Sequence, residues 1–385
     1  MSARRSAPLA PAVWAAGIVT FAVLYAPQGL LTQLAAEYAL TPAEASWAVS
    51  ATTLGLACAI LPWAFFSDRV GLHRALQIAT LATGILATAS PFAPGFGLFL
   101  AGRALLGAAL GGIPALAVSY IQEAAPAGRA PSLAASYVAA TSAGGLLGRI
   151  AIAPLAELAG WRLALVGLGV AAAAICALLA ATLPATPVRR VTLRQSLTLF
   201  FRQLGSGAVW PYYAVGALSI GVLVAVYNSL VFRLEAPPYL LAPTAASLVF
   251  LCYLAGTVSS RLSSGISARI GARATIAVAG CAVLAGALVT LASPLWLVIA
   301  GVALLTAGEF LGHATANAQV PRVAREGRQH AVALYSVTYY IGASAFGVLG
   351  AQLFGSAGWP GLVAGAAVAA LAIAGFGILA REPRG

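Results

Sequence analysis

Long apolar segments alternate with short polar turns along the whole chain. Each segment is long enough, or nearly so, for the roughly 20 residues that a helix needs to cross a bilayer. Thr41, Pro42 and Glu44 form a capping box with proline at the first helical position, which marks the start of the second segment. The pattern predicts an all-α membrane protein with twelve transmembrane helices, near residues 12–34, 45–65, 75–90, 95–121, 132–155, 163–183, 209–232, 244–262, 274–292, 296–320, 331–354 and 360–380.

The longest polar connection separates six of these segments from the other six. We therefore expect an N-terminal bundle at 1–183, a cytoplasmic linker at 184–207 and a C-terminal bundle at 208–385. Apolar side chains recur at helical spacing in the linker, which favours an amphipathic helix on the inner leaflet over a solvated loop. The residues concerned are Leu193, Leu197, Phe200, Phe201 and Leu204, while Arg190, Arg194 and Arg202 supply positive charge.

Composition excludes soluble proteins and ATP-driven pumps. Of the 385 residues, 61% are hydrophobic and 8% are charged, which is too little charge to cover a soluble protein of this size. All 21 basic residues are arginine, so the lysine of a Walker-type phosphate loop is missing. An enzyme is not indicated either, because no nucleophile–base pair or metal-ligand spacing occurs.

The arginines lie mainly on one side of the predicted helices. The two tails and the loops after even-numbered segments hold 16 of the 21, whereas the opposite loops hold only Arg162 and Arg233. Short loops rich in arginine stay in the cytoplasm. Both termini are therefore predicted to be cytoplasmic, and the net charge of +12 requires no nucleic-acid partner.

The two halves of the chain repeat each other at an offset near 200 residues. Ala89-Ser90-Pro91 returns as Ala292-Ser293-Pro294, and Ala159-Gly160-Trp161 returns as Ala357-Gly358-Trp359. Transporters built from such repeats bind substrate between the halves, near the bilayer midplane.

A charged turn joins the second and third segments, with the sequence Ser67-Asp68-Arg69-Val70-Gly71-Leu72-His73-Arg74. It resembles the loop between helices 2 and 3 of the major facilitator superfamily, with Ala64 in place of the first glycine of that signature. The fourth segment contains Arg103, Gly107 and Gly111 at four-residue spacing, and the fifth contains Ser142-Ala143-Gly144-Gly145-Leu146-Leu147-Gly148-Arg149. These motifs are similar to those of the twelve-helix drug:proton antiporter branch, in particular bacterial arabinose- or drug-efflux permeases.

The resemblance implies two pseudo-symmetric six-helix bundles in a bacterial inner (cytoplasmic) membrane. It implies a small-molecule substrate, protons as the coupling ion and alternating access. We expect a monomer without cofactor or metal. By the same resemblance, a cytoplasmic charge cluster latches the outward-open state; its residues are Asp68, Arg69, Gly71, Arg74 and Glu123.

Ionisable side chains inside the predicted helices are candidates for function, because each costs about 2.5–3.5 kcal/mol to insert at mid-bilayer. Glu309, His313 and Asn317 follow one another at four-residue spacing on one helical face. A glutamate–histidine pair is suited to binding and releasing a proton, and the alternative is a hydrogen-bonded pair that only stabilises helix packing.

For Arg103 and Arg149 the alternatives are likewise a functional role and a role in helix packing. Arg103 would bias the protonation of a carboxylate or bind an anionic substrate, or it would satisfy backbone carbonyls at a helix contact. Arg149 lies in a glycine-rich helix and is equally compatible with substrate binding and packing. Tyr25, Gln28, Asn228 and Asn317 complete the predicted substrate cavity.

The sequence favours a proton-coupled exporter of a small organic compound. The alternative is a facilitator or importer of a sugar or organic anion, in which Arg103 and Arg149 bind a carboxylate or phosphate.

Overall fold

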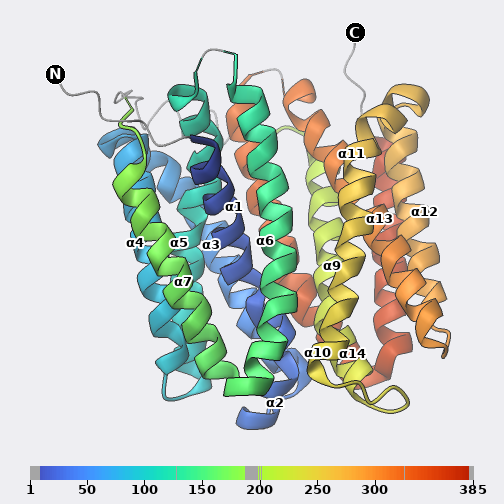
Figure 1. Ribbon diagram of the computed structural model, residues 1–385. Helices are drawn as coiled ribbons and strands as arrows, with labels where there is room; N and C mark the ends of the chain where they lie inside the picture. Colours follow the sequence, from blue (N-terminus) through green and yellow to red (C-terminus); the bar gives the residue numbers. More distant parts are fainter. Residues whose placement is uncertain are drawn as a thin grey trace. The chain divides into compact units, whose positions relative to one another are not determined.

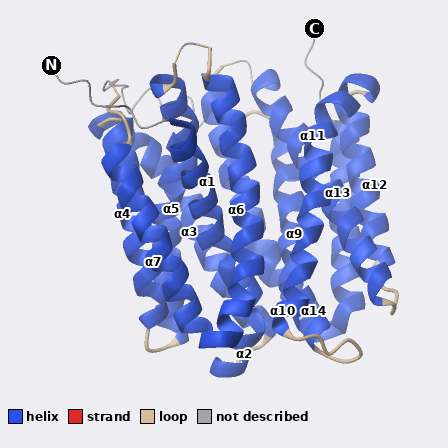
Figure 2. Cartoon of the chain, viewed as in Figure 1, coloured by secondary structure: helices blue, strands red, loops and turns tan. Residues whose placement is uncertain are grey.

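A computed structural model of the chain describes residues 9–126, 128–186, 198, 200, 202–324 and 326–380. All regular secondary structure of these residues is helical (Figure 2). The chain divides into two compact units, Met1–Leu30 with Ala51–Thr192 and Leu31–Ser50 with Leu193–Gly385. Residues 31–50, which the sequence places in the N-terminal bundle, thus belong to the second unit by their contacts.

Eleven helical stretches of the described chain are long and apolar enough to cross a membrane. Those of the first unit are α1 (Leu9–Tyr25) with η1 (Ala26–Leu30), most of α3 (Pro42–Val70), α4 (Leu72–Ala89) with η2 (Ser90–Phe92), α5 (Phe96–Ala124), α6 (Ala130–Ala159) and α7 (Trp161–Thr182) (Figure 1).

The second unit has the remaining helices. They are α2 (Leu31–Tyr38), which continues α1, then α9 (Trp210–Glu235), α10 (Pro243–Ser247), η3 (Leu248–Cys252), α11 (Tyr253–Ile270), α12 (Ala272–Val289), α13 (Leu295–Val323) and α14 (Arg328–Leu379) (Figure 1). Each of the twelve predicted segments overlaps one of the helical stretches, and the last two both fall in α14.

The capping box predicted before the second segment is confirmed. The backbone N–H of Thr41 donates to Glu44 Oε2 at 2.8 Å, and the N–H of Glu44 donates to Thr41 Oγ1 at 3.3 Å. The first turn of a helix leaves N–H groups without partners, and this exchange satisfies two donors there. Helix α3 begins at Pro42 for that reason.

Helix α14 contains a break near its end. A straight helix of 52 residues would be about 78 Å long, far more than the roughly 30 Å hydrocarbon core. Gly358 has φ 64° and ψ −165°, a conformation that is essentially restricted to glycine. Its counterpart in the sequence repeat, Gly160, has φ 81° and ψ 153° and separates α6 from α7. The repeat thus extends to the backbone conformation of the two glycines.

Close packing of α1 on α6 requires glycine on α6. A methyl group at Gly144 would lie 2.3 Å from the carbonyl oxygen of Ile18, and one at Gly148 would lie 2.5 Å from that of Ala22. Both distances are well below van der Waals contact, so only glycine permits this approach. The contact brings Arg149, the next residue of α6, against the broken end of α1.

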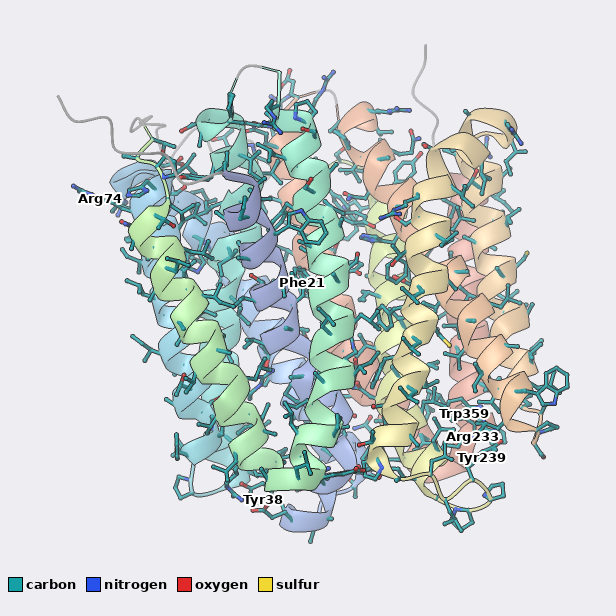
Figure 3. All side chains as sticks on the ribbon, viewed as in Figure 1. Phe21, Tyr38, Arg74, Arg233, Tyr239 and Trp359 are labelled. Carbon is teal, nitrogen blue, oxygen red and sulfur yellow. The ribbon has the colours of Figure 1, made fainter. Side chains whose placement is uncertain are left out.

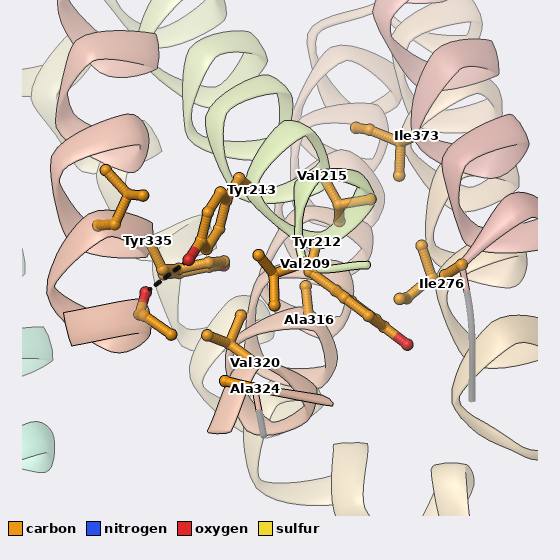
Figure 4. Packing of buried hydrophobic residues seen from close by; sticks show 13 residues of the cluster. Val209, Tyr212, Tyr213, Val215, Ile276, Ala316, Val320, Ala324, Tyr335 and Ile373 are labelled. Atoms are coloured by element: carbon orange, nitrogen blue, oxygen red, sulfur yellow. Dashed lines mark hydrogen bonds between the residues drawn. The ribbon is translucent and has the colours of Figure 1, made fainter. Parts of the chain in front are cut away.

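A buried aromatic and aliphatic cluster joins the first turns of α9 to the end of α13 and the start of α14 (Figure 4). Tyr212 and Tyr213 are fully buried in it, and Tyr335 is 2% exposed. Phe200, from the predicted amphipathic linker, packs against the same cluster. Most of that linker, including Leu193, Leu197, Phe201, Arg190 and Arg194, lies outside the described residues.

Candidate functional site

Arg103 lies on α5 and contacts the place where α1 breaks. In a regular helix the amide of residue 27 would donate to the Val23 carbonyl, but residue 27 is proline and has no N–H. Both terminal nitrogens of Arg103 donate to Val23 O at 3.3 Å, and Nη2 also donates to Leu24 O at 2.8 Å. The side chain is 2% exposed. Of the roles that the sequence leaves open for Arg103, these contacts fit the one in which it satisfies backbone carbonyls and braces a helix contact.

Arg149 lies on α6 and reaches the next residues of the same break. Its Nε donates to Gln28 Oε1 at 2.5 Å, and Nη1 donates to the carbonyl of Gly145 at 2.7 Å. Its guanidinium carbon stands 3.9 Å from the centre of the Tyr25 ring, which is a cation–π geometry. Tyr25, Gln28 and Arg149, three of the residues predicted for the substrate cavity, therefore come together inside the first unit.

Glu309 is the most deeply buried carboxylate among the described residues. It lies on α13, is 1% exposed, and its Oε1 has no hydrogen-bond partner in the described part of the chain. An ionised carboxylate oxygen in that position is costly, whereas a proton or a cationic ligand would satisfy it. Among the described residues of the second unit, this buried carboxylate is the main candidate for binding a proton or a cation.

His313 lies one turn beyond Glu309 but finds its hydrogen bond on another helix. Its Nδ1 is 2.9 Å from the hydroxyl of Tyr335 on α14, and its ring packs 4.4 Å from the ring of Tyr339. Asn317, the third residue of the predicted stripe, is exposed.

Tyr335 is a site residue that the sequence analysis does not identify. The available signal is the four-residue spacing of Tyr335 and Tyr339, which places both rings on one face of a helix. That spacing says nothing about which other helix the rings face.

Asn228 also lies in the second unit, on α9. It is fully buried, and a methyl group at Gly347 of α14 would lie 3.5 Å from its Nδ2. The preceding residue, Tyr227, shares a 3.0 Å hydrogen bond with Thr306 of α13, and its ring packs on those of Phe250 and Tyr253. Asn228 thus belongs to a polar and aromatic layer between α9, α13 and α14.

The predicted latch residues gather at one end of the first unit. Asp68 and Arg69 lie in the last turn of α3, Arg74 lies in the first turn of α4, and Glu123 lies in the last turn of α5. Gly71 turns the chain between α3 and α4 with φ 89°, and its N–H donates to Ser67 O at 2.8 Å. Asp68 is partly buried, whereas both arginines and Glu123 are exposed.

At one end of the second unit, an arginine ties three elements together (Figure 3). Arg233 of α9 donates to Thr290 O at 2.7 Å and stands 4.5 Å from the centre of the Trp359 ring. Trp359 in turn donates from Nε1 to Thr290 Oγ1 at 2.9 Å. Because Trp359 directly follows Gly358, this contact holds the break in α14.

The chain resembles known membrane transporters over nearly its whole length. Residues 13–326 match the sequence profile of the Major Facilitator Superfamily. The uncharacterized MFS-type transporter YybF of Bacillus subtilis is 32% identical over 360 residues, which cover 91% of this chain and 88% of YybF. The inner membrane transport protein YnfM of Escherichia coli is 31% identical over 354 residues, covering 91% of this chain and 85% of YnfM.

A shorter match and two solved structures extend the comparison. The niacin transporter NiaP of Acinetobacter baylyi is 34% identical over 98 residues, covering 26% of this chain and 22% of NiaP. A D-xylose–proton symporter superposes with a TM-score of 0.75 at 16% identity, covering 95% of this chain and 96% of the symporter. The nucleoside transporter NupG superposes with a TM-score of 0.76 at 12% identity, covering 97% and 99%. At these identities the two structures share the fold alone.

Proposed function

The chain belongs to the Major Facilitator Superfamily and is a multi-pass membrane transporter, and on that premise we propose that it exports a small organic compound in exchange for protons. The observation that carries the proposal is the buried carboxylate of Glu309, whose Oε1 has no hydrogen-bond partner among the described residues. Such a group needs a proton or a cation whenever it is enclosed by the protein.

In this proposal Glu309 binds the coupling proton, and His313, one turn away, modulates the proton affinity of Glu309. Exchange requires that the proton and the substrate compete for the carrier, so that the release of one accompanies the binding of the other and each weakens the affinity for the other. A carboxylate whose proton must leave before the substrate binds provides that competition.

Arg103 and the cluster of Tyr25, Gln28 and Arg149 have distinct roles in the proposal. Arg103 braces the break in α1, and the cluster supplies substrate-binding residues of the first unit. Asn228 and Asn317 are substrate-binding residues of the second unit. Asp68, Arg69, Gly71, Arg74 and Glu123 form the cytoplasmic latch.

The proposal includes the topology. The two arms of α14 on either side of Gly358 cross the membrane separately, which gives twelve spans in a monomeric inner-membrane protein with cytoplasmic termini. Support comes from the length of α14 and from the 16 arginines in the tails and in the loops on their side. Green fluorescent protein fused to the C-terminus should fluoresce and alkaline phosphatase fused there should be inactive. The opposite pattern would overturn this topology.

The test of the coupling role uses Glu309→Gln in proteoliposomes. A thermal-stabilisation screen with arabinose, chloramphenicol, ethidium and niacin first identifies a compound that binds, and that compound is then used for transport. The glutamine variant keeps the shape of the side chain but cannot release a proton. We expect uphill transport driven by a pH gradient to disappear, while exchange of labelled for unlabelled compound persists.

Glu326→Gln is the matched control, because Glu326 is an exposed carboxylate of the same unit that pairs with Arg202 at 2.6 Å. Exposed pairs contribute little, so this variant should transport as the parent does. Full gradient-driven transport by Glu309→Gln would refute Glu309 as the coupling site.

A second candidate function is the import of an organic anion. It is favoured by the buried guanidinium of Arg149 beside Tyr25 and Gln28, and by the 98-residue similarity to a niacin transporter. The direction of coupling separates the two candidates in proteoliposomes loaded at one pH and diluted into another. If the vesicles accumulate niacin when the outside is more acidic, import by proton symport is correct. If protons that enter the vesicles drive the compound out of them, export in exchange for protons is correct.

A further inference from the structure

The hydroxyl of Tyr335 makes two contacts with one residue. It stands 2.9 Å from Nδ1 of His313 and donates to the backbone carbonyl oxygen of His313 at 3.2 Å. Tyr335 is 2% exposed and His313 is partly buried. The two residues come from different helices, so this bifurcated contact fixes the imidazole ring relative to α14.

The single hydroxyl proton of Tyr335 can go to the carbonyl oxygen or to Nδ1, and this choice is linked to the protonation of the ring. A carbonyl oxygen can only accept a hydrogen bond, and a tyrosine hydroxyl has one proton to donate. If that proton goes to the carbonyl of His313, the phenolic oxygen can engage Nδ1 only as an acceptor. Nδ1 must then be the protonated nitrogen.

We infer that Tyr335 holds neutral His313 in the tautomer with the proton on Nδ1, leaving Nε2 as its basic nitrogen. Tyr335 is therefore a positioning residue that acts through His313. The ring of Tyr339 also packs against the imidazole, with 4.4 Å between the ring centres, and Glu309 lies one turn away from His313 on the same helix. Tyr213 of α9, the next phenol of the cluster, already donates its proton to Ala331 O at 3.1 Å (Figure 4).

The tautomer affects how His313 takes up and releases a proton, and this role in proton transfer rests on the proposed function. A proton that arrives at Nε2 leaves the Nδ1–H bond to Tyr335 in place. The ring therefore gains and loses its proton without reorientation, and groups held in this way reorganise little during transfer. The tautomer itself does not depend on whether the chain couples transport to protons.

Nitrogen NMR of the full-length protein in lipid bilayers tests the tautomer directly. The chain has three histidines, so replacing His73 and His330 with glutamine leaves His313 as the single signal. Histidine labelled with ¹⁵N at Nδ1 or at Nε2 distinguishes protonated from bare imidazole nitrogen, because the bare nitrogen resonates far downfield. We expect a protonated Nδ1 and a bare Nε2 at neutral pH.

Two variants test whether Tyr335 is responsible. Tyr335→Phe keeps the ring and removes the hydroxyl, and we expect the Nδ1 signal to move downfield as the proton shifts to Nε2. Tyr213→Phe removes the neighbouring hydroxyl of the same cluster and should leave both signals unchanged.

Three results would overturn the inference: a bare Nδ1 in the parent, an Nδ1 and Nε2 that are both protonated in the parent, or an Nδ1 that stays protonated in Tyr335→Phe. If the parent shows the expected tautomer and the Glu309→Gln variant retains gradient-driven transport, the proposed coupling is refuted. The tautomer assignment then remains intact.

Discussion

At the scale of single residues, the buried polar side chains of this transporter are of two kinds. Arg103 and Arg149 bond to backbone or amide oxygens around the break in α1, so their positive charges are compensated by carbonyl dipoles and an aromatic face. The Oε1 of Glu309 has no such partner among the described residues. Polar groups that are fully bonded stabilise a structure, whereas a buried carboxylate oxygen without a partner costs free energy unless it binds a proton or a cation.

The bracing role of Arg103 predicts a coupling with Pro27. Arg103→Ala leaves the Val23 and Leu24 carbonyls without their charged donor, and we expect the free energy of unfolding to fall by about 2–3 kcal/mol. Pro27→Ala restores a backbone N–H that can donate to Val23. The loss caused by Arg103→Ala should therefore be smaller in the Pro27→Ala background, by about 1 kcal/mol.

Unfolding by sodium dodecyl sulfate in mixed micelles measures this double-mutant cycle. Additive effects of the two changes would contradict the bracing role, and loss of transport in Arg103→Ala at unchanged stability would return Arg103 to the substrate or proton site.

At the scale of elements, two helix breaks depend on the same pair of residue types, a glycine followed by a tryptophan. Gly160 and Gly358 occupy the same position in the two repeats, and each is followed by a tryptophan that packs against an arginine. Trp161 lies 4.4 Å from the guanidinium of Arg162, and Trp359 lies 4.5 Å from that of Arg233. The glycine supplies the backbone conformation at both positions, and at the second one Trp359 anchors the following arm of α14 to Arg233 of α9.

Gly358→Ala should therefore destabilise the second unit. A side chain at φ 64° and ψ −165° is strained by about 1–3 kcal/mol, although an added methyl group would make only an ordinary contact, 3.7 Å from Cδ of Pro360. Gly355→Ala is the matched control, because Gly355 lies in regular helix and a methyl group there meets no atom within 4 Å. That change should stabilise α14 by about 0.5–1 kcal/mol.

Thermal unfolding in detergent measures both variants. Equal midpoints for Gly358→Ala and Gly355→Ala would show that the break does not depend on the glycine conformation.

At the scale of the whole molecule, each unit is a helical bundle, and alternating access requires the protein to change between conformations. In the proposal, the latch at the α3–α4 turn stabilises one of these conformations. Asp68 is the carboxylate of that turn, at the C-terminal end of α3.

Asp68→Asn tests the latch. The residue lies at the end of a helix and is partly buried, so we expect normal folding and membrane insertion. Transport should slow at least several-fold, because the neutral amide loses the charge that the arginines of the turn attract. Initial rates in proteoliposomes measure this effect.

Glu157→Gln is the control, since Glu157 is a carboxylate near the C-terminal end of α6, which runs opposite to α3 in the first unit. Unchanged kinetics for Asp68→Asn would refute the latch, and equal slowing by Glu157→Gln would make the effect nonspecific.

Much of this protein follows from local sequence. The apolar segments, the capping box at Thr41, the glycine turns and the repeat at an offset near 200 residues are each visible in short stretches. They are local because bilayer thickness sets helix length, because a cap involves residues three positions apart, and because a strained turn needs glycine wherever the chain folds. The burial of Glu309 was predictable in the same way, from a lone carboxylate in an apolar segment.

Tertiary structure alone decided which polar groups meet. Sequence spacing pairs Glu309 with His313, but the hydrogen bond of His313 goes to Tyr335 on α14. The spacing of Arg103 in α5 does not show that it reaches the carbonyl left open by Pro27 in α1. Such contacts depend on which helices are neighbours and on their relative height and rotation, and these follow from the packing of complete helices. The periodicity of a single segment contains no information about them.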